Sequence, residues 1–433
     1  MIRPEELALH HNRYGLALGF VAAQLAGLPD ETLLSYPAMT NPSKIMAMEL
    51  LGKQFENLSF AGDRVSMQII PFKMMQISLT YGMSPLAPVG FALYGNYLTL
   101  VRGEVGEGYR YVKFSLSLMK SMPSRAHDSE ILFYATPTRL RIEPIQSSIE
   151  YFTDAYKAAM AAGSMRYALG CSVHYNNCSF WSGKKLDVVV HLMEEMMKQL
   201  NYHKNFAIIA LTLPVKRIEL RLMGQSDDTP ENEDMINAFG DKLPTMLLLT
   251  ICFVNFYEGL IFREFDKVRD HIEKYSSIQS LTTVNMANTC EFFRIFYAGL
   301  VSFWVGRELD EKEWIARGVE CKEEIEKLAA SASKWNFQNK SYLLQAEEQF
   351  CERNFEEAEA LYDAAILSSK THKFVNEEAL ANELAGHFYL ETGRRKRSVQ
   401  YFSRALEKYN EWGAVAKAAT LTKYFDRSGD ATI

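Results

Sequence analysis

The sequence predicts an all-α protein, a solenoid built from antiparallel helical hairpins. The main observation is a recurring spacing, in which a small residue is followed four positions on by a larger apolar residue and three positions later by another small or aromatic one. A second observation is that no run of alternating apolar and polar residues persists, which disfavours strands. The copies of the spacing are Ala358–Tyr362–Ala365, Ser398–Phe402–Ala405 and Ser148–Phe152–Ala155, with looser ones at Val268–Ile272–Tyr275 and Gly108–Val112–Ser115.

For the copy that begins at Ser398, the preceding helix of the hairpin can also be identified, because Gly386 and Tyr389 lie twelve and nine residues before Ser398. This layout resembles the tetratricopeptide repeat, in which two antiparallel helices pack through small residues and stack on the next pair. We therefore predict a tetratricopeptide-like α-solenoid.

The composition is that of an ordinary folded chain: of 433 residues, 48% are hydrophobic and 23% are charged. The formal net charge of −6 argues against a chain-wide basic surface for nucleic acid or anionic membrane, and we predict neither as a partner. Six scattered cysteines form no Cys-x-x-Cys pair, which favours free thiols in a reducing, cytoplasmic environment.

Two apolar segments bear on membrane targeting. The N-terminal residues lack the basic start and long apolar run of a secretory signal. The most apolar stretch, residues 243–260, contains Pro244, Asn255 and Glu258 and is predicted to be a core helix.

The first block is predicted to span residues 1–223. A helix over residues 7–25 ends at Gly27 and Pro29, and the next helix begins with Asn41 as its cap and Pro42 in its first turn. Amphipathic helices then alternate with breaks up to about residue 222. The predicted breaks are Pro71, 82–85, Gly103 to Gly108, 121–124, Pro137, Pro144, Gly163 and 182–183.

Residues 224–240 are acidic and are predicted to form an exposed linker, with an acidic docking motif as the alternative. The second block, residues 241–433, carries hairpins at 246–275, 284–330, 339–370 and 377–409. Ala358 and Ser398 are 40 residues apart, against a usual period of about 34, and the turn at 368–375 is predicted to hold the excess. A capping helix at 414–425 should present Lys417, Lys423, Asp426 and Arg427 on a polar outer face.

The segments 378–394 and 405–417 resemble the end of a helical region in large multidomain signalling kinases, of the hybrid histidine kinase and serine/threonine kinase types. There it lies between an AAA-type ATPase module and C-terminal signalling domains. Segments 36–42 and 78–88 resemble the same region in the same order, so the resemblance covers residues 27–425.

The resemblance implies a regulatory, protein-binding role without catalysis, because the catalytic domains of that family flank the helical region. This sequence contains no Gly-x-x-x-x-Gly-Lys-Ser/Thr phosphate loop, no His-Arg-Asp and no Asp-Phe-Gly. We therefore expect a non-catalytic interaction scaffold in signal transduction, with kinase or ATPase components among its partners and no cofactor. The alternative is a regulatory segment of a larger AAA-ATPase or kinase polypeptide whose catalytic domains lie outside this chain.

The predicted partner-binding residues lie in the last repeat. By analogy with tetratricopeptide groove positions, Glu383 and His387 should face a protein or peptide on the concave side of the superhelix. The basic turn Arg394, Arg395, Lys396 and Arg397 is either a solvated turn or a contact for an acidic partner, a phosphate group or a nuclear import receptor.

Other patterns have structural explanations that compete with a chemical one. Cys171, His174 and Cys178 share a helix face, where they are packing residues, zinc ligands or a thiol–imidazole pair. His10 and His11 diverge by about 100° on a helix and suit a metal poorly. Residues 193–197 are Met-rich and fit a helix core better than an adaptable partner groove.

Overall fold

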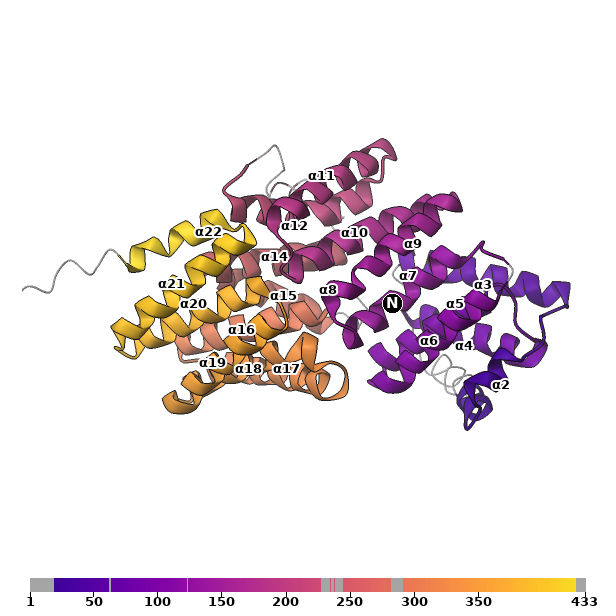
Figure 1. The fold of residues 1–433 in the computed structure, drawn as a ribbon, viewed down its shortest axis with the longest axis horizontal. Helices are drawn as coiled ribbons and strands as arrows, with labels where there is room; N and C mark the ends of the chain where they lie inside the picture. The colour runs from indigo at the N-terminus through magenta and orange to yellow at the C-terminus, as the bar shows by residue number, and fades with distance from the viewer. Residues whose placement is uncertain are drawn as a thin grey trace, which may run out of the picture. The chain divides into compact units, whose positions relative to one another are not determined.

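The computed structural model describes residues 19–61, 64–122, 124–226, 234, 237, 244–281 and 291–425. Within these residues the chain is an all-α solenoid of helical hairpins, and the one departure is an isolated bridge between Ala38 and Met83 (Figure 1). The helices group into two compact units. Unit 1 comprises the described residues within 1–142 and 150–171, and unit 2 comprises the described residues within 143–149, 172–283 and 290–433.

This division lies earlier in the chain than the predicted boundary at residues 224–240, most of which lie outside the described residues. The same holds for His10, His11 and the first part of the predicted helix at 7–25, of which residues 19–25 are described and helical.

Unit 1 begins its long helices as the capping signals predict, because the Asn41 side chain accepts the amides of Ser43 and Lys44 at 3.0 and 3.3 Å. Its helices are α2 (Asp30–Leu34), α3 (Pro42–Ala61), α4 (Arg64–Tyr81), α5 (Ala87–Leu100), α6 (Val105–Ser121), α7 (Asp128–Ile142), α9 (Glu150–Ala161) and the first half of α10 (Met165–Trp181).

Two of the predicted breaks are wrong. Pro71 lies inside α4 and Pro137 inside α7, although proline removes a helical hydrogen bond and crowds the preceding turn. The helix continues because apolar residues on both sides of Pro71 are held in the core, with Ile70 and Phe72 buried. Tertiary packing here outweighs the local cost of proline.

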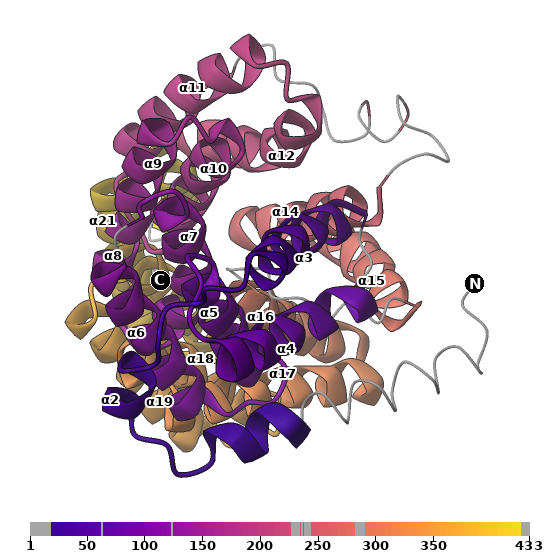
Figure 2. The ribbon, with the colours of Figure 1, turned by 90° about the vertical axis from the view of Figure 1, so that its right-hand side faces the viewer.

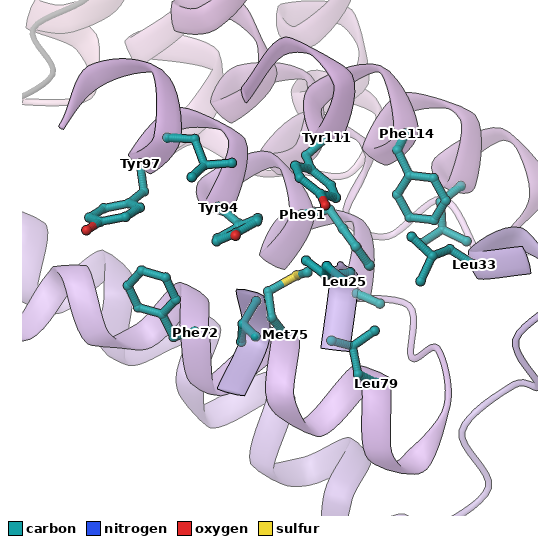
Figure 3. Packing of buried hydrophobic residues seen from close by; sticks show 14 of the residues in the cluster. Leu25, Leu33, Phe72, Met75, Leu79, Phe91, Tyr94, Tyr97, Tyr111 and Phe114 are labelled. Carbon is teal, nitrogen blue, oxygen red and sulfur yellow. The ribbon is translucent and has the colours of Figure 1, made fainter. Parts of the chain in front are cut away.

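The core of unit 1 is aromatic. The ring of Phe72 on α4 meets Tyr94 and Tyr97 of α5 edge to face, with centroids 5.8 and 4.8 Å apart. Figure 3 shows these rings facing one another, with Phe91 and Tyr111 continuing the cluster along α5 and α6. This aromatic cluster holds α4, α5 and α6 together.

The two N-terminal segments that carry the family resemblance, 36–42 and 78–88, lie side by side in unit 1. Met39 donates its amide to the Met83 carbonyl and Met83 donates to the Pro37 carbonyl, both at 2.9 Å. Gly82 has φ of +96°, and a Cβ there would lie 2.5 Å from the Pro37 carbonyl oxygen. Only glycine fits this position without a backbone shift.

Unit 2 continues the hairpins (Figure 1). Its elements are α8 (Ile145–Ser148), the second half of α10, α11 (Leu186–Tyr202), α12 (Phe206–Met223), α14 (Thr245–Phe262), α15 (Phe265–Leu281), α16 (Glu291–Leu309), α17 (Lys312–Ser331), α18 (Lys334–Cys351), α19 (Phe355–Thr371), α20 (Val375–Glu391), α21 (Arg395–Trp412), α22 (Val415–Thr420) and the 3₁₀ turn η2 (Thr422–Tyr424).

The predicted small-residue contacts hold these hairpins together. A Cβ on Gly386 of α20 would lie 2.8 Å from the Phe402 ring of α21, and one on Gly318 of α17 would lie 2.8 Å from Phe303 of α16. All the larger residues of the predicted stripes are buried. The spacing therefore marks the hairpin seam, as the sequence predicts.

A common turn joins the helices of unit 2. In the described turns other than the one between α17 and α18, one residue has positive φ and the next amide donates to a carbonyl five residues back, which is the Schellman arrangement. At the α17–α18 turn the Ser333 amide makes the same bond to the Leu328 carbonyl, but Ala332 has φ of −114°. The turn between α19 and α20 is only His372 to Phe374, so the predicted long turn at 368–375 is wrong. The 40-residue period comes instead from helices of 17 and 18 residues.

α14 is the most apolar helix of unit 2. Among the described residues it is the one helix long and apolar enough to cross a membrane, with mean hydropathy 1.7, and 78% of it is buried. Figure 2 shows α14 beside α15, and its aromatic residues pack against other helices of unit 2. The burial fits the predicted core helix.

Contacts between segments far apart in the sequence join the beginning of unit 2 to its C-terminal helices. Trp412 at the end of α21 donates its indole N–H to the Lys184 carbonyl at 3.0 Å, and Asn376 donates to the Trp181 carbonyl at 3.1 Å. Trp181 in turn packs against Tyr257 of α14 and Tyr297 of α16, with centroids 4.8 and 5.6 Å apart. The segment 172–186 thus packs against α14, α16, α20 and α21.

Candidate partner-binding groove

Glu383 and His387, predicted to face a partner, are buried instead. Glu383 is 1% exposed and accepts hydrogen bonds from Lys417 at 2.6 Å and Tyr409 at 2.7 Å. Lys417, predicted on the polar outer face of the cap, is likewise 1% exposed. Because α22 and η2 fold back over α20, neither Glu383 nor His387 has surface for a partner.

The electrostatics of this pair follow from burial. Burial alone would raise the pKa of Glu383, but Lys417 and His387 outweigh it and hold that pKa at about 2. Burial lowers the pKa of His387 to about 4 despite the adjacent carboxylate, so the imidazole is neutral at pH 7. Lys417 and Glu383 form a buried ion pair that locks α22 onto α20.

The basic turn divides into two pairs. Arg394 and Arg397 both bond to the Glu359 carboxylate of α19, the former at 2.7 Å, and the Arg394 guanidinium also lies 4.6 Å from the Tyr389 ring centre. Arg395 and Lys396 are exposed and have no ion pair within the part of the chain that the structure describes. Arg394 and Arg397 therefore stabilise the packing of the turn on α19. Arg395 and Lys396 form no ion pair with the described residues.

Arg395 stands at the rim of a surface groove of about 260 Å³ between α20, α21 and η2. Its apolar lining includes the Phe402 ring, which stacks on Tyr424 with centroids 4.2 Å apart and planes 12° from parallel. The lining residues are Leu390, Arg395, Ser398, Val399, Phe402, Lys423 and Tyr424. We call this the C-terminal groove.

The buried residues lie directly behind the groove. The His387 ring contacts Phe402 and Tyr424 edge on, with centroids 5.0 and 5.4 Å away. His387 and Glu383 thus support the floor of the C-terminal groove from inside. Sequence reasoning missed Tyr424 and Lys423 as lining residues, because no local spacing pairs them with residues more than twenty positions earlier.

A second surface groove, of about 660 Å³, lies between α15, α16 and α17. Its lining is mixed in charge, since Arg317 pairs with Glu313 while Glu273 and Glu320 face the same space. The apolar part includes Trp314 and Ala298. Surface grooves therefore accompany two separate hairpins of unit 2.

The cysteine–histidine set on α10 is packed. Cys171 and Cys178 are buried free thiols, and burial raises the pKa of Cys171 to about 12. Burial lowers the pKa of His174 to about 4. A thiol that stays protonated at neutral pH is a poor nucleophile. Within the described ranges, no three His, Cys, Asp or Glu side chains gather as metal ligands.

Two other segments take structural roles. Met193 and Met196 are buried on α11, as core packing predicts. The glycine-rich segment was predicted to be a turn throughout, but only Gly103 lies in the turn, and Gly106 and Gly108 are inside α6. Gly108 is helical because it packs against α5, where a Cβ would lie 2.5 Å from the Gly95 carbonyl oxygen.

Comparisons with known proteins do not assign this chain to a family. No protein-family model matches the chain. A search of curated proteins finds no match either.

Proposed function

We propose that this protein is a non-catalytic scaffold that binds a protein partner at the surface of its tetratricopeptide-like hairpins. The observation that carries the proposal is the C-terminal groove, where an exposed cation, Arg395, borders an apolar floor. A charged rim around an apolar centre is the usual anatomy of a protein-binding surface. The proposed partner surface is this groove and not Glu383 and His387, which are buried.

The construction of the hairpins supports this role. Fixed turns and glycine seams hold each hairpin in one geometry, so the groove exists before any partner arrives. A preformed site avoids part of the ordering cost of association. Rigid presentation of surface side chains is what helical-repeat scaffolds supply.

The signalling role and the partner class rest on the resemblance of segments 36–42, 78–88 and 378–417 to the helical region of signalling kinases. On that basis, kinase or ATPase components are the proposed partners. The five described cysteines are all free thiols, which supports a reducing, cytoplasmic location.

Affinity capture tests the proposal. The tagged full chain is incubated in native lysate, and retained proteins are quantified by mass spectrometry against the tag alone. We expect a small, reproducible set that includes a kinase, ATPase or response-regulator component. Retention indistinguishable from the tag alone, with a folded and helical bait, would contradict the scaffold role.

A further inference from the structure

We propose that the C-terminal groove binds an acidic peptide segment of the partner, with a carboxylate between Arg395 and Lys423 and an apolar side chain on the floor. This inference rests on the proposed scaffold function and names the chemistry of the occupant. It follows from the charge, the floor and the size of the groove.

The charge at the rim of the groove depends on which cations nearby already have a carboxylate partner. Arg394 and Arg397 share the Glu359 carboxylate as their ion-pair partner, so two of the four cations of the turn are held by α19. Arg395 and Lys423 line the groove, are exposed and have no carboxylate partner among the described residues. Among the described residues no acidic side chain lines the groove, so the rim that they form is positive and complements a carboxylate.

The apolar floor of the groove favours a ligand that carries an apolar side chain next to the carboxylate. Tyr424 stacks in parallel on the fully buried Phe402 ring, and His387 supports both rings from behind, so Tyr424 is the aromatic residue that a ligand can reach. Leu390 and Val399 complete the apolar lining. Burying an aliphatic or aromatic side chain here supplies most of the affinity, because solvent screens exposed ion pairs and leaves each of them a small contribution.

The size favours a peptide over a free small molecule. The groove holds about 260 Å³, below the range of about 300–1,000 Å³ typical of small-molecule sites. A space of this size accommodates one anchoring side chain, while the rest of the ligand runs along the surface. A short acidic segment with one apolar anchor fits that description.

Selection from a random library tests the inference without knowledge of the partner. A phage-displayed library of 12-residue peptides is panned against the full-length protein, and enriched peptides are synthesised and titrated by fluorescence anisotropy. We expect enriched peptides to carry two or more Asp or Glu residues flanking a Leu, Ile, Phe or Trp. The double substitution Arg395→Glu with Lys423→Glu should weaken their binding at least ten-fold.

The single substitution Arg395→Glu should also weaken binding, and Lys396→Glu is its matched control, since it makes the same charge change on the adjacent exposed residue, which does not line the groove. We expect it to alter affinity less than two-fold. Enrichment of peptides without acidic residues, or equal weakening by Lys396→Glu, would overturn the inference. Displacement of the peptides by a single-stranded oligonucleotide at equal concentration would overturn it as well, by pointing to nucleic acid.

The two proposals fail separately. If wild-type protein retains a lysate partner and the double variant retains it equally, the groove inference is wrong and the scaffold function stands. If neither protein retains a partner and no acidic peptide is enriched, both are wrong. Circular dichroism and urea denaturation confirm that the exposed substitutions leave the fold intact.

Discussion

At the scale of single residues, the turns show where sequence reasoning succeeds and fails. Glycines such as Gly163, Gly183 and Gly393 marked turns correctly because they have positive φ. Five other turns place a non-glycine residue in the left-handed region, where no glycine signals it. These residues are Lys204, Arg263, Asp310, Arg353 and Lys373. Here the fixed hairpin geometry imposes the conformation on whatever residue is present.

Gly393→Ala tests the backbone requirement. A Cβ there meets nothing within 4 Å, so the cost comes from φ of +77° alone, and we expect a loss of about 1–2 kcal/mol in the free energy of unfolding. Gly106→Ala is the control, since Gly106 is helical with equally open space. It should gain about 0.5–1 kcal/mol. Urea denaturation measures both, and the same sign for the two would refute the explanation.

His387 makes stability depend on pH. Its folded-state pKa of about 4 lies below the ordinary value of 6.5, so its contribution is present above pH 6.5 and is lost as pH falls towards 4. The difference corresponds to roughly 3 kcal/mol. We expect His387→Gln to make the stability profile between pH 6.5 and 4 less steep, and part of the remaining slope to come from His174, whose pKa burial also lowers to about 4. His203→Gln, at an exposed histidine, should leave the profile as steep as in wild type.

At the scale of elements, the C-terminal cap is the clearest case that the sequence misassigned. A lysine in a short amphipathic helix is ordinarily solvent-exposed, so Lys417 was predicted outside. The structure buries it because Glu383, on a helix 34 residues earlier, offers a carboxylate at 2.6 Å. Helix existence and the seam residues could be predicted from local spacing, whereas this pairing depends on how separate elements meet.

Lys417→Met should destabilise the packing of α22 on α20 strongly. Removing one partner leaves the Glu383 carboxylate buried and unpaired, which costs about 3–5 kcal/mol. Adding Glu383→Gln removes the stranded charge and keeps an acceptor for the Tyr409 hydroxyl. We expect the double variant to recover most of the loss, measured as a double-mutant cycle in urea. A double variant as unstable as the single one would show that the charge is not the cause.

The pairing of segments 36–42 and 78–88 depends on Gly82. Gly82→Ala adds a Cβ 2.5 Å from the Pro37 carbonyl oxygen in a left-handed conformation, so we expect faster hydrogen exchange at the Met39 and Met83 amides. Gly103→Ala is the control, since Gly103 also has positive φ but no atom within 4 Å of its Cβ. Exchange at these two amides that is unchanged by Gly82→Ala would contradict the role assigned to the close approach.

At the scale of the whole molecule, fold class follows from spacing alone, but the location of the binding surface does not. The repeat pattern predicted hairpins and placed partner residues on the inner side, as an open superhelix would. The structure buries Glu383 and His387, and residues 172–186 pack against other helices of unit 2, as in the contact of Trp412 with Lys184, more than two hundred positions apart. The surface that we propose for a partner is therefore the C-terminal groove, whose walls come from α20, α21 and η2.

Site-specific photocrosslinking tests this placement most directly. The photoreactive residue p-benzoylphenylalanine replaces Val399 in the groove floor or, as a control, Leu367, which is 66% exposed on α19 outside the groove. After irradiation in native lysate, we predict a discrete crosslinked partner from position 399, with an acidic segment at the linkage, and none of it from position 367. Crosslinking of the same protein from position 367 alone would contradict the claim that the C-terminal groove is the binding surface.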